Sequence, residues 1–166
     1  MRLEELLINL DGLSDEEAES VGRREYHDLY LNRGKIGVLE LFKGGEVVFH
    51  ENRYEHAFRT SQDHRGNPYS KTVVARDRIE RMRWIRAIIA GEVPKTECWL
   101  VSARPGKSGR DRLYVVWENR YVVWFTARDK GGWMFSTAYS ASCQDIRRYT
   151  TGGSQLWIVP ERKEAP

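Results

Sequence analysis

The chain has 166 residues and a net charge of +3 at pH 7, with six tryptophans and eight tyrosines, enough for one domain with a sizeable core. Its longest apolar runs are far shorter than the roughly 18 residues that span a membrane, and its N-terminus lacks the basic start and cleavage site of a signal peptide. Two cysteines, Cys98 and Cys143, are too few for a disulfide framework. We therefore expect a cytoplasmic, reduced protein with no membrane association.

The charge is distributed unevenly along the chain. Residues 51–150 hold 19 Lys and Arg against 11 Asp and Glu, a net charge of +8, whereas the two flanks together hold 8 against 13, a net charge of −5. A basic central segment favours a phosphate-rich partner such as nucleic acid, but an arginine-rich surface that only faces water has the same composition. Composition leaves both interpretations open.

The first elements are predicted as two helices and a hairpin. Residues 3–10 have the pattern of a short amphipathic helix. Ser14, followed three residues later by Glu17, forms the signature of a capping box, which predicts a second helix that ends at Gly34. Two apolar stretches then flank a Lys-Gly-Gly-Glu turn at 43–46, which predicts a β-hairpin. The stretch that follows fits a short helix or a strand, and turn-forming residues then predict a long loop over 61–75.

The clearest helix is RDRIERMRWIRAIIAGE, which begins at Arg76. Its apolar stripe consists of Ile79, Met82, Ile85 and Ile89, and Gly91 closes it. Four strand candidates follow in quick succession, ECWLVSA, RLYVVWE, RYVVWFTA and WMFSTAYS, and their short links predict an antiparallel meander.

The fold class predicted from these elements is α+β, with helices packed on one face of an antiparallel four-stranded meander and an N-terminal β-hairpin. We divide the chain into an N-terminal helical extension (1–33), a main domain (34–160) and a frayed tail (161–166).

Two places combine residue types that suit phosphate chemistry. Arg78 lies one heptad before Ile85 on the apolar stripe, where it forms a salt bridge, reaches water or binds a phosphate with two hydrogen bonds. In the last strand, strict alternation places Thr137 and Tyr139 on one face with Trp133 and Phe135. That face is either an ordinary half-buried sheet surface or a platform that binds phosphate and stacks bases.

His56 is the histidine whose context stands out, because it has apolar neighbours and precedes the long loop. An imidazole can carry a proton near neutral pH, although a single histidine is more often structural. The sequence shows no zinc-type Cys/His spacing, no HExxH, no Walker loop, no GxSxG and no GxGxxG. We expect neither a metal nor a cofactor.

The order of these features resembles the barnase–EndoU–colicin–RelE-like nuclease superfamily, and most closely its prophage-associated branch. The resemblance covers roughly residues 35–142. Its motifs are His56-Ala57-Phe58, then Arg78, Glu80, Arg81, Trp84 and Ile85, and finally Thr137-Ala138-Tyr139.

The resemblance implies metal-independent endoribonuclease activity, in which a ribose 2′-OH attacks the adjacent phosphate, and it suggests a toxin or a phage-derived effector. RNA would be the substrate, and an immunity or antitoxin protein a possible partner. In this scheme His56 is the general acid or base, Arg78 stabilises the phosphate, Thr137 positions it and Tyr139 supports or stacks. Secondary substrate-binding candidates are Arg59, Lys71, Arg81 and Ser136. The chain departs from branches that use two histidines, so the second proton carrier is unassigned.

Two alternatives belong to other classes. A non-catalytic nucleic-acid-binding module of the same fold predicts salt-dependent binding that survives loss of His56 and weakens without Arg78. A protein-interaction domain that docks through its acidic N-terminal helices predicts no RNA binding at moderate salt.

Overall fold

The computed structural model describes residues 1–61, 71–102 and 110–161. Most of the predicted 61–75 loop, most of the link between the first two meander strands and most of the predicted frayed tail lie outside these residues. The first half of the chain contains η1 (Leu3–Leu6), α1 (Asp15–Tyr30), β1 (Ile36–Glu40), β2 (Glu46–His50), α2 (Arg53–Phe58), β3 (Arg59–Thr60) and β4 (Val73–Val74). The second half contains α3 (Arg76–Glu80), α4 (Met82–Ile89), β5 (Glu97–Ser102), β6 (Arg110–Val116), β7 (Tyr121–Ala127), β8 (Trp133–Ser140), α5 (Cys143–Thr150) and β9 (Ser154–Ile158).

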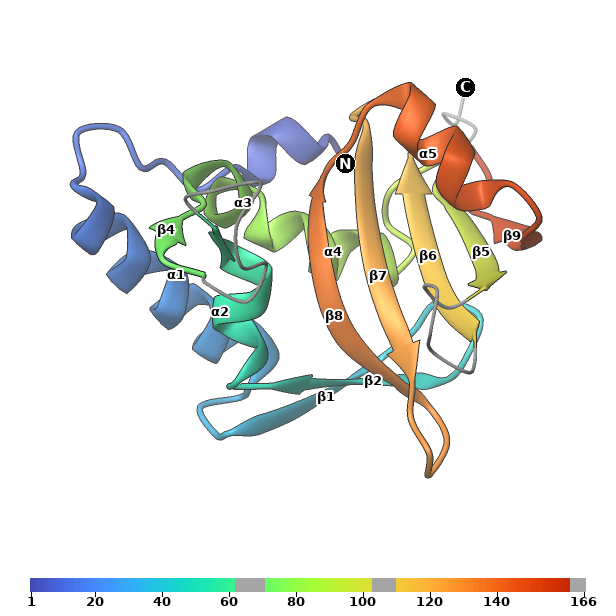
Figure 1. Cartoon of the computed structure of the whole chain (residues 1–166), viewed down its shortest axis with the longest axis horizontal. Helices are drawn as coiled ribbons and strands as arrows, with labels where there is room; N and C mark the ends of the chain where they lie inside the picture. Colours follow the sequence, from blue (N-terminus) through green and yellow to red (C-terminus); the bar gives the residue numbers. More distant parts are fainter. Residues whose placement is uncertain (62–70, 103–109, 162–166) are drawn as a thin grey trace, which may run out of the picture.

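The main sheet has seven strands in the order β1-β2-β8-β7-β6-β5-β9 (Figure 1). The expected hairpin pairs β1 with β2, and β5 to β8 form antiparallel neighbours. The predicted four-stranded meander is nevertheless wrong, because the hairpin joins it through a parallel pairing of β2 with β8, and β9 extends its other edge. Parallel neighbours are far apart in sequence, so the period of the strands gives no sign of their pairing.

Helices cover both faces of this sheet, which corrects the expectation of a single helical face. On one face the main core contains Ile79, Ile85 and the rings of Tyr121 and Phe125. On the other face Ile146 of α5 packs with a second cluster that includes Trp124. Figure 1 shows α5 in front of the strands and α4 behind them. The sequence predicts only a turn and a last short strand after β8, because the apolar stripe of α5 is thin; the strand is present as β9, and the turn is a helix.

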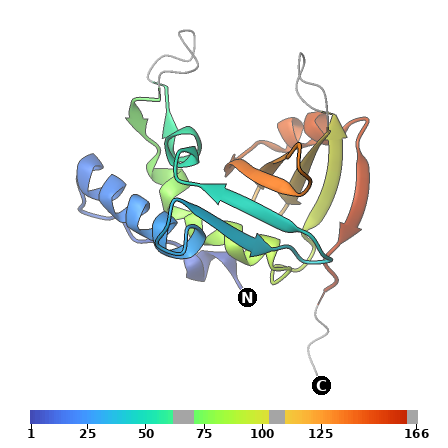
Figure 2. The same cartoon turned by 90° about the horizontal axis from the view of Figure 1, so that it is seen from below.

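The N-terminal segment shares the main core. Ser14 accepts a hydrogen bond from the backbone of Glu17, whose carboxylate in turn accepts one from the Ser14 backbone, so the predicted capping box is present. Tyr26 and Tyr30 of α1 are buried against Phe49 of β2. Figure 2 shows α1 beside the β1–β2 hairpin. Residues 1–33 and the segment after them therefore contribute to one hydrophobic core.

The predicted long helix is broken into α3 and α4 at Arg81, whose backbone leaves the helical range (φ −96°, ψ 8°). The predicted stripe of Ile79, Met82, Ile85 and Ile89 is fully buried. The break changes the direction of the chain, so that α3 packs near α2 and β8 while α4 continues under the sheet.

Strand β8 contains a β-bulge at its centre. Trp124 of β7 pairs with Thr137, whereas the next residue, Phe125, pairs with Phe135, so Ser136 is the extra residue. A bulge shifts the alternation of side chains by one position. Phe135 therefore faces the main core, whereas Tyr139 packs with the second cluster. The expectation that Phe135, Thr137 and Tyr139 share one face is wrong for this reason.

Candidate functional site

Arg78 connects three elements at the upper end of β8. Its Nη1 donates a hydrogen bond to the backbone carbonyl of Ala57 at 3.2 Å, at the end of α2. Its guanidinium carbon lies 5.2 Å from the centre of the Tyr139 ring on β8, within the range of a cation–π contact. The guanidinium forms no ion pair with any Asp or Glu that the structure describes. Arg78 is thus a half-buried cation with donors to spare.

Arg53, at the start of α2, has the same character. Its Nη2 lies 3.2 Å from Oγ and 3.5 Å from the backbone oxygen of Ser136, the bulged residue of β8. Its Nε is buried without a hydrogen-bond partner, and no described carboxylate pairs with it. Burial lowers the pKa of the Arg53 guanidinium from its usual value, but a guanidinium stays protonated in proteins.

His56 lies on α2, three residues after Arg53. Residues three apart in a helix lie on neighbouring positions of its surface. His56 immediately precedes Ala57, whose carbonyl accepts from Arg78. The imidazole is half-buried, so it is not sealed in the core, where Tyr54, Ala57 and Phe58 carry the packing of α2.

The two predicted catalytic residues of β8 differ in their surroundings. The hydroxyl of Tyr139 accepts from Nε1 of Trp124 at 3.2 Å and donates to the hydroxyl of Tyr149 at 3.1 Å. This chain fixes the ring under Arg78, which suits a supporting role. Thr137 is 5 % exposed, so it is largely covered by its neighbours. Ser136 accepts from Arg53 rather than standing alone.

The remaining predicted substrate-binding residues lie in other contacts. Arg59 forms a bidentate ion pair with Glu19 of α1, with distances of 2.7 and 2.8 Å. Arg81 donates to the Asp77 carbonyl and lies 5.3 Å from the centre of the Trp84 ring. Lys71 is half-buried just before β4.

Three arginines of the basic segment are neutralised by α1. Besides Arg59 with Glu19, Arg83 forms a bidentate pair with Glu25 at 2.6 and 3.2 Å. Arg76 lies 3.2 Å from Asp15 and also donates to two backbone carbonyls of the N-terminal segment. The acidic charge of α1 is therefore used within the chain, and it balances these arginines rather than Arg53 or Arg78.

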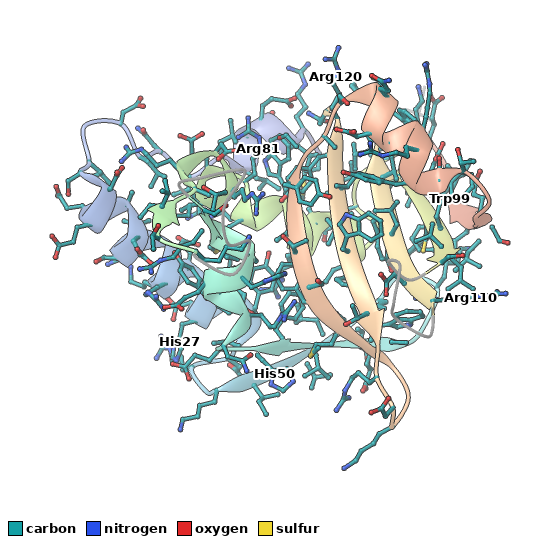
Figure 3. All side chains as sticks on the ribbon, in the orientation of Figure 1. His27, His50, Arg81, Trp99, Arg110 and Arg120 are labelled. Carbon is teal, nitrogen blue, oxygen red and sulfur yellow. The ribbon has the colours of Figure 1, made fainter. Side chains whose placement is uncertain are left out.

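The other described histidines lie elsewhere. His27 belongs to α1 and His50 ends β2, and Figure 3 shows both near the β1–β2 hairpin. His64 falls outside the described residues. The same view places Arg81 beside α3 and Trp99 beside α5.

Two cavities are lined by residues other than those of the candidate site. One of about 980 Å³ lies between η1 and the ends of β5, β6 and β9, and its walls include Leu3, Lys95 and Trp117. The other, of about 290 Å³, lies between α1 and α2 and is lined by Arg23, His27 and others.

Comparisons with protein-family models, with curated proteins and with solved structures find no match. The nuclease resemblance therefore stays a prediction. Within the part of the chain that the structure describes, no group of three or more His, Cys, Asp or Glu is placed to hold a metal ion. No helix in that part is long and apolar enough to cross a membrane.

The site thus consists of two cations that pair with no described carboxylate, a histidine on the helix that begins with one of them, and a bulged strand that carries an anchored phenol ring. Such cations suit a multiply charged oxyanion, because a guanidinium offers paired donors to phosphate oxygens. The sequence indicated His56, Arg78 and Tyr139, but not Arg53. The position of Arg53, three residues before His56 on a short helix, was the one available signal.

Proposed function

We propose that the protein is a metal-independent endoribonuclease-like enzyme that cleaves RNA by attack of a 2′-OH on the adjacent phosphate. The observation that carries the proposal is the placement of Arg78. Among the described residues it pairs with no carboxylate, and it bonds to the carbonyl of the residue after His56 and lies over Tyr139. A phosphate on Arg78 would therefore lie beside the end of α2, the helix that carries His56.

In this proposal His56 removes the proton of the ribose 2′-OH. The bond between O2′ and phosphorus forms, the bond between phosphorus and O5′ breaks, and the departing oxygen takes a proton from water. Arg78 stabilises the negative charge that accumulates on the phosphate oxygens in the transition state. Tyr139 holds the Arg78 guanidinium in place through its ring. Thr137, being covered, has no role in this step.

RNA cleavage in the presence of EDTA tests the proposal. His56→Ala should lower the cleavage rate by at least about 100-fold, since a positioned general base contributes about 10²–10⁴. His27→Ala is the matched control, because it removes an imidazole from another helix. The proposal fails if cleavage needs added magnesium or if His56→Ala cleaves as fast as the wild type.

One observation favours binding without cleavage as the second candidate. The Tyr139 hydroxyl is already bonded to Trp124 and Tyr149, so a second proton carrier is not evident among the described residues. A module that binds without cleaving would retain RNA in EDTA, leave it intact, and bind equally well after His56→Ala.

A further inference from the structure

We infer that Arg53 and Ser136 form a second phosphate subsite beside Arg78, so that the protein holds two consecutive phosphates of one RNA strand along β8. This inference rests on the proposed function and specifies its substrate. It gives a role in the site to Arg53, which the nuclease resemblance does not include.

No described carboxylate balances the charge of Arg53. Taking a guanidinium out of water costs free energy, and proteins recover that cost through a paired anion and filled donors. Arg53 is half-buried; among the described residues its hydrogen bonds go only to Ser136, and its buried Nε has no partner there. By contrast Arg59, also partly buried, uses two donors on Glu19. Arg53 therefore lacks an anion that the fold supplies to the other arginine.

The bulge of β8 lies directly against Arg53. Ser136 is the extra residue of β8, and its hydroxyl and carbonyl oxygen both face the Arg53 guanidinium. These two contacts use Nη2 and fix the orientation of the guanidinium, and Nη1, which has no partner among the described residues, is the donor left for a ligand. Bulges of this kind occur preferentially beside binding and active sites, where they redirect a side chain. The bulge thus holds the Arg53 guanidinium in position.

The residues that hold Arg53 and Arg78 are spaced along both α2 and β8. Arg53 and the Ala57 carbonyl that holds Arg78 are four residues apart on α2, about 6 Å along the helix axis. On β8, Ser136 and Tyr139 are three residues apart, about 10 Å in a regular strand and less across a bulge. Successive phosphates of one strand rise by about 3.4 Å along a helix axis and also turn about it, so the direct distance between them is larger than this rise. The spacing of these anchoring points is therefore compatible with consecutive phosphates of one strand.

Beyond its short ladder with β2, one side of β8 is bordered by α2 (Figure 1). Past the second pair of the β2–β8 ladder, Met134 with Val48, β8 pairs with β7 alone among the described strands. Helix α2 lies along that side of β8 (Figure 1), with Phe58 packed on Phe135. A backbone that runs over the surface where α2 meets β8 would pass Arg53 and then Arg78.

The experiment measures binding of 2′-O-methyl tetrauridylate, which cannot be cleaved because its nucleophile is blocked. A set of probes carries one uncharged methylphosphonate at each linkage in turn. For the wild type we expect two adjacent linkages at which loss of charge weakens binding about tenfold, because a charge-assisted hydrogen bond is lost. This scan needs no variant and is independent of folding effects.

Variants then assign each linkage. Arg53→Ala should become insensitive to one of the two linkages while staying sensitive to the other, and the slope of log affinity against log salt should shrink by about 0.7. Arg53→Lys, which keeps the cation, should retain most of that slope. Arg83→Ala is the matched control, because it removes an arginine that is paired with Glu25. Thermal unfolding of each variant checks the fold.

The outcomes separate the two proposals. A single sensitive linkage, or an Arg53→Ala variant with the wild-type salt slope and linkage profile, overturns the second subsite and leaves His56-dependent cleavage standing. A wild-type protein that binds none of the probes overturns the inference, and one that also cleaves no RNA in EDTA overturns the proposed function with it.

Discussion

The arginines that face α1 and the arginines that face β8 come from the same short segment of chain but are balanced in different ways. Arg59, Arg76 and Arg83 each pair with a carboxylate of α1. Arg53 and Arg78 instead contact a serine, a backbone carbonyl and a tyrosine ring. Net charge alone would give all five the same role. The pairing divides them into arginines that hold the N-terminal segment to the core and arginines left with capacity for an external anion.

Among the arginines, the largest expected effect comes from Arg78→Ala. If Arg78 stabilises the transition state, its loss should lower the RNA cleavage rate about 100-fold, equivalent to about 3 kcal/mol. The free energy of unfolding should change much less, because one hydrogen bond to Ala57 is lost. Activity and urea unfolding measured on the same preparation check both numbers. A loss of activity that merely follows the loss of fold would break the comparison.

The next effect is on stability. Arg76→Ala removes the donors to the carbonyls of Leu10 and Leu13, at 2.8 and 2.9 Å, and should lower the free energy of unfolding by about 2 kcal/mol, since charged hydrogen bonds contribute more than neutral ones. Urea denaturation measures this. Arg24→Ala, on the exposed side of α1, is the control and should change stability by less than about 0.5 kcal/mol. Equal effects of the two changes would contradict the view that Arg76 holds the N-terminal segment to the core.

The smallest effect is a coupling energy. Arg59→Ala, Glu19→Ala and the double variant form a cycle whose interaction term should be about 1 kcal/mol, because the pair is bidentate and Glu19 is largely covered. Part of this coupling should be lost at high salt, because the Arg59 side chain is partly exposed to solvent. A coupling indistinguishable from zero would mean that Arg59 is not committed to α1, and would restore it as a substrate-binding candidate.

Features that depend on neighbours in the sequence were predicted well. The capping box at Ser14, the turn at residues 43–46 and the buried stripe from Ile79 to Ile89 are all present. Each is set by residues a few positions apart, so its physical cause is visible in the linear chain. Arg78 was identified for the same reason, because it continues that stripe.

Features that depend on distant segments were missed. The parallel pairing of β2 with β8, the helix α5 on the second face and the pairing of β9 with β5 follow from which surfaces bury each other. The bulge at Ser136 follows from fitting β8 to β7 on one side and α2 on the other. An error of one residue in the register reverses the two faces of a strand, which is why strict alternation misplaced Thr137 and Tyr139.

The sequence by itself determined the local elements, the basic central segment and the candidates His56 and Arg78, because charge and periodicity are properties of the chain. Only the tertiary structure decided which arginines keep an unbalanced charge. That outcome depends on whether a carboxylate from α1, far away in sequence, comes within reach of each guanidinium. It does so for Arg59, Arg76 and Arg83, and Arg53 faces the bulged strand instead.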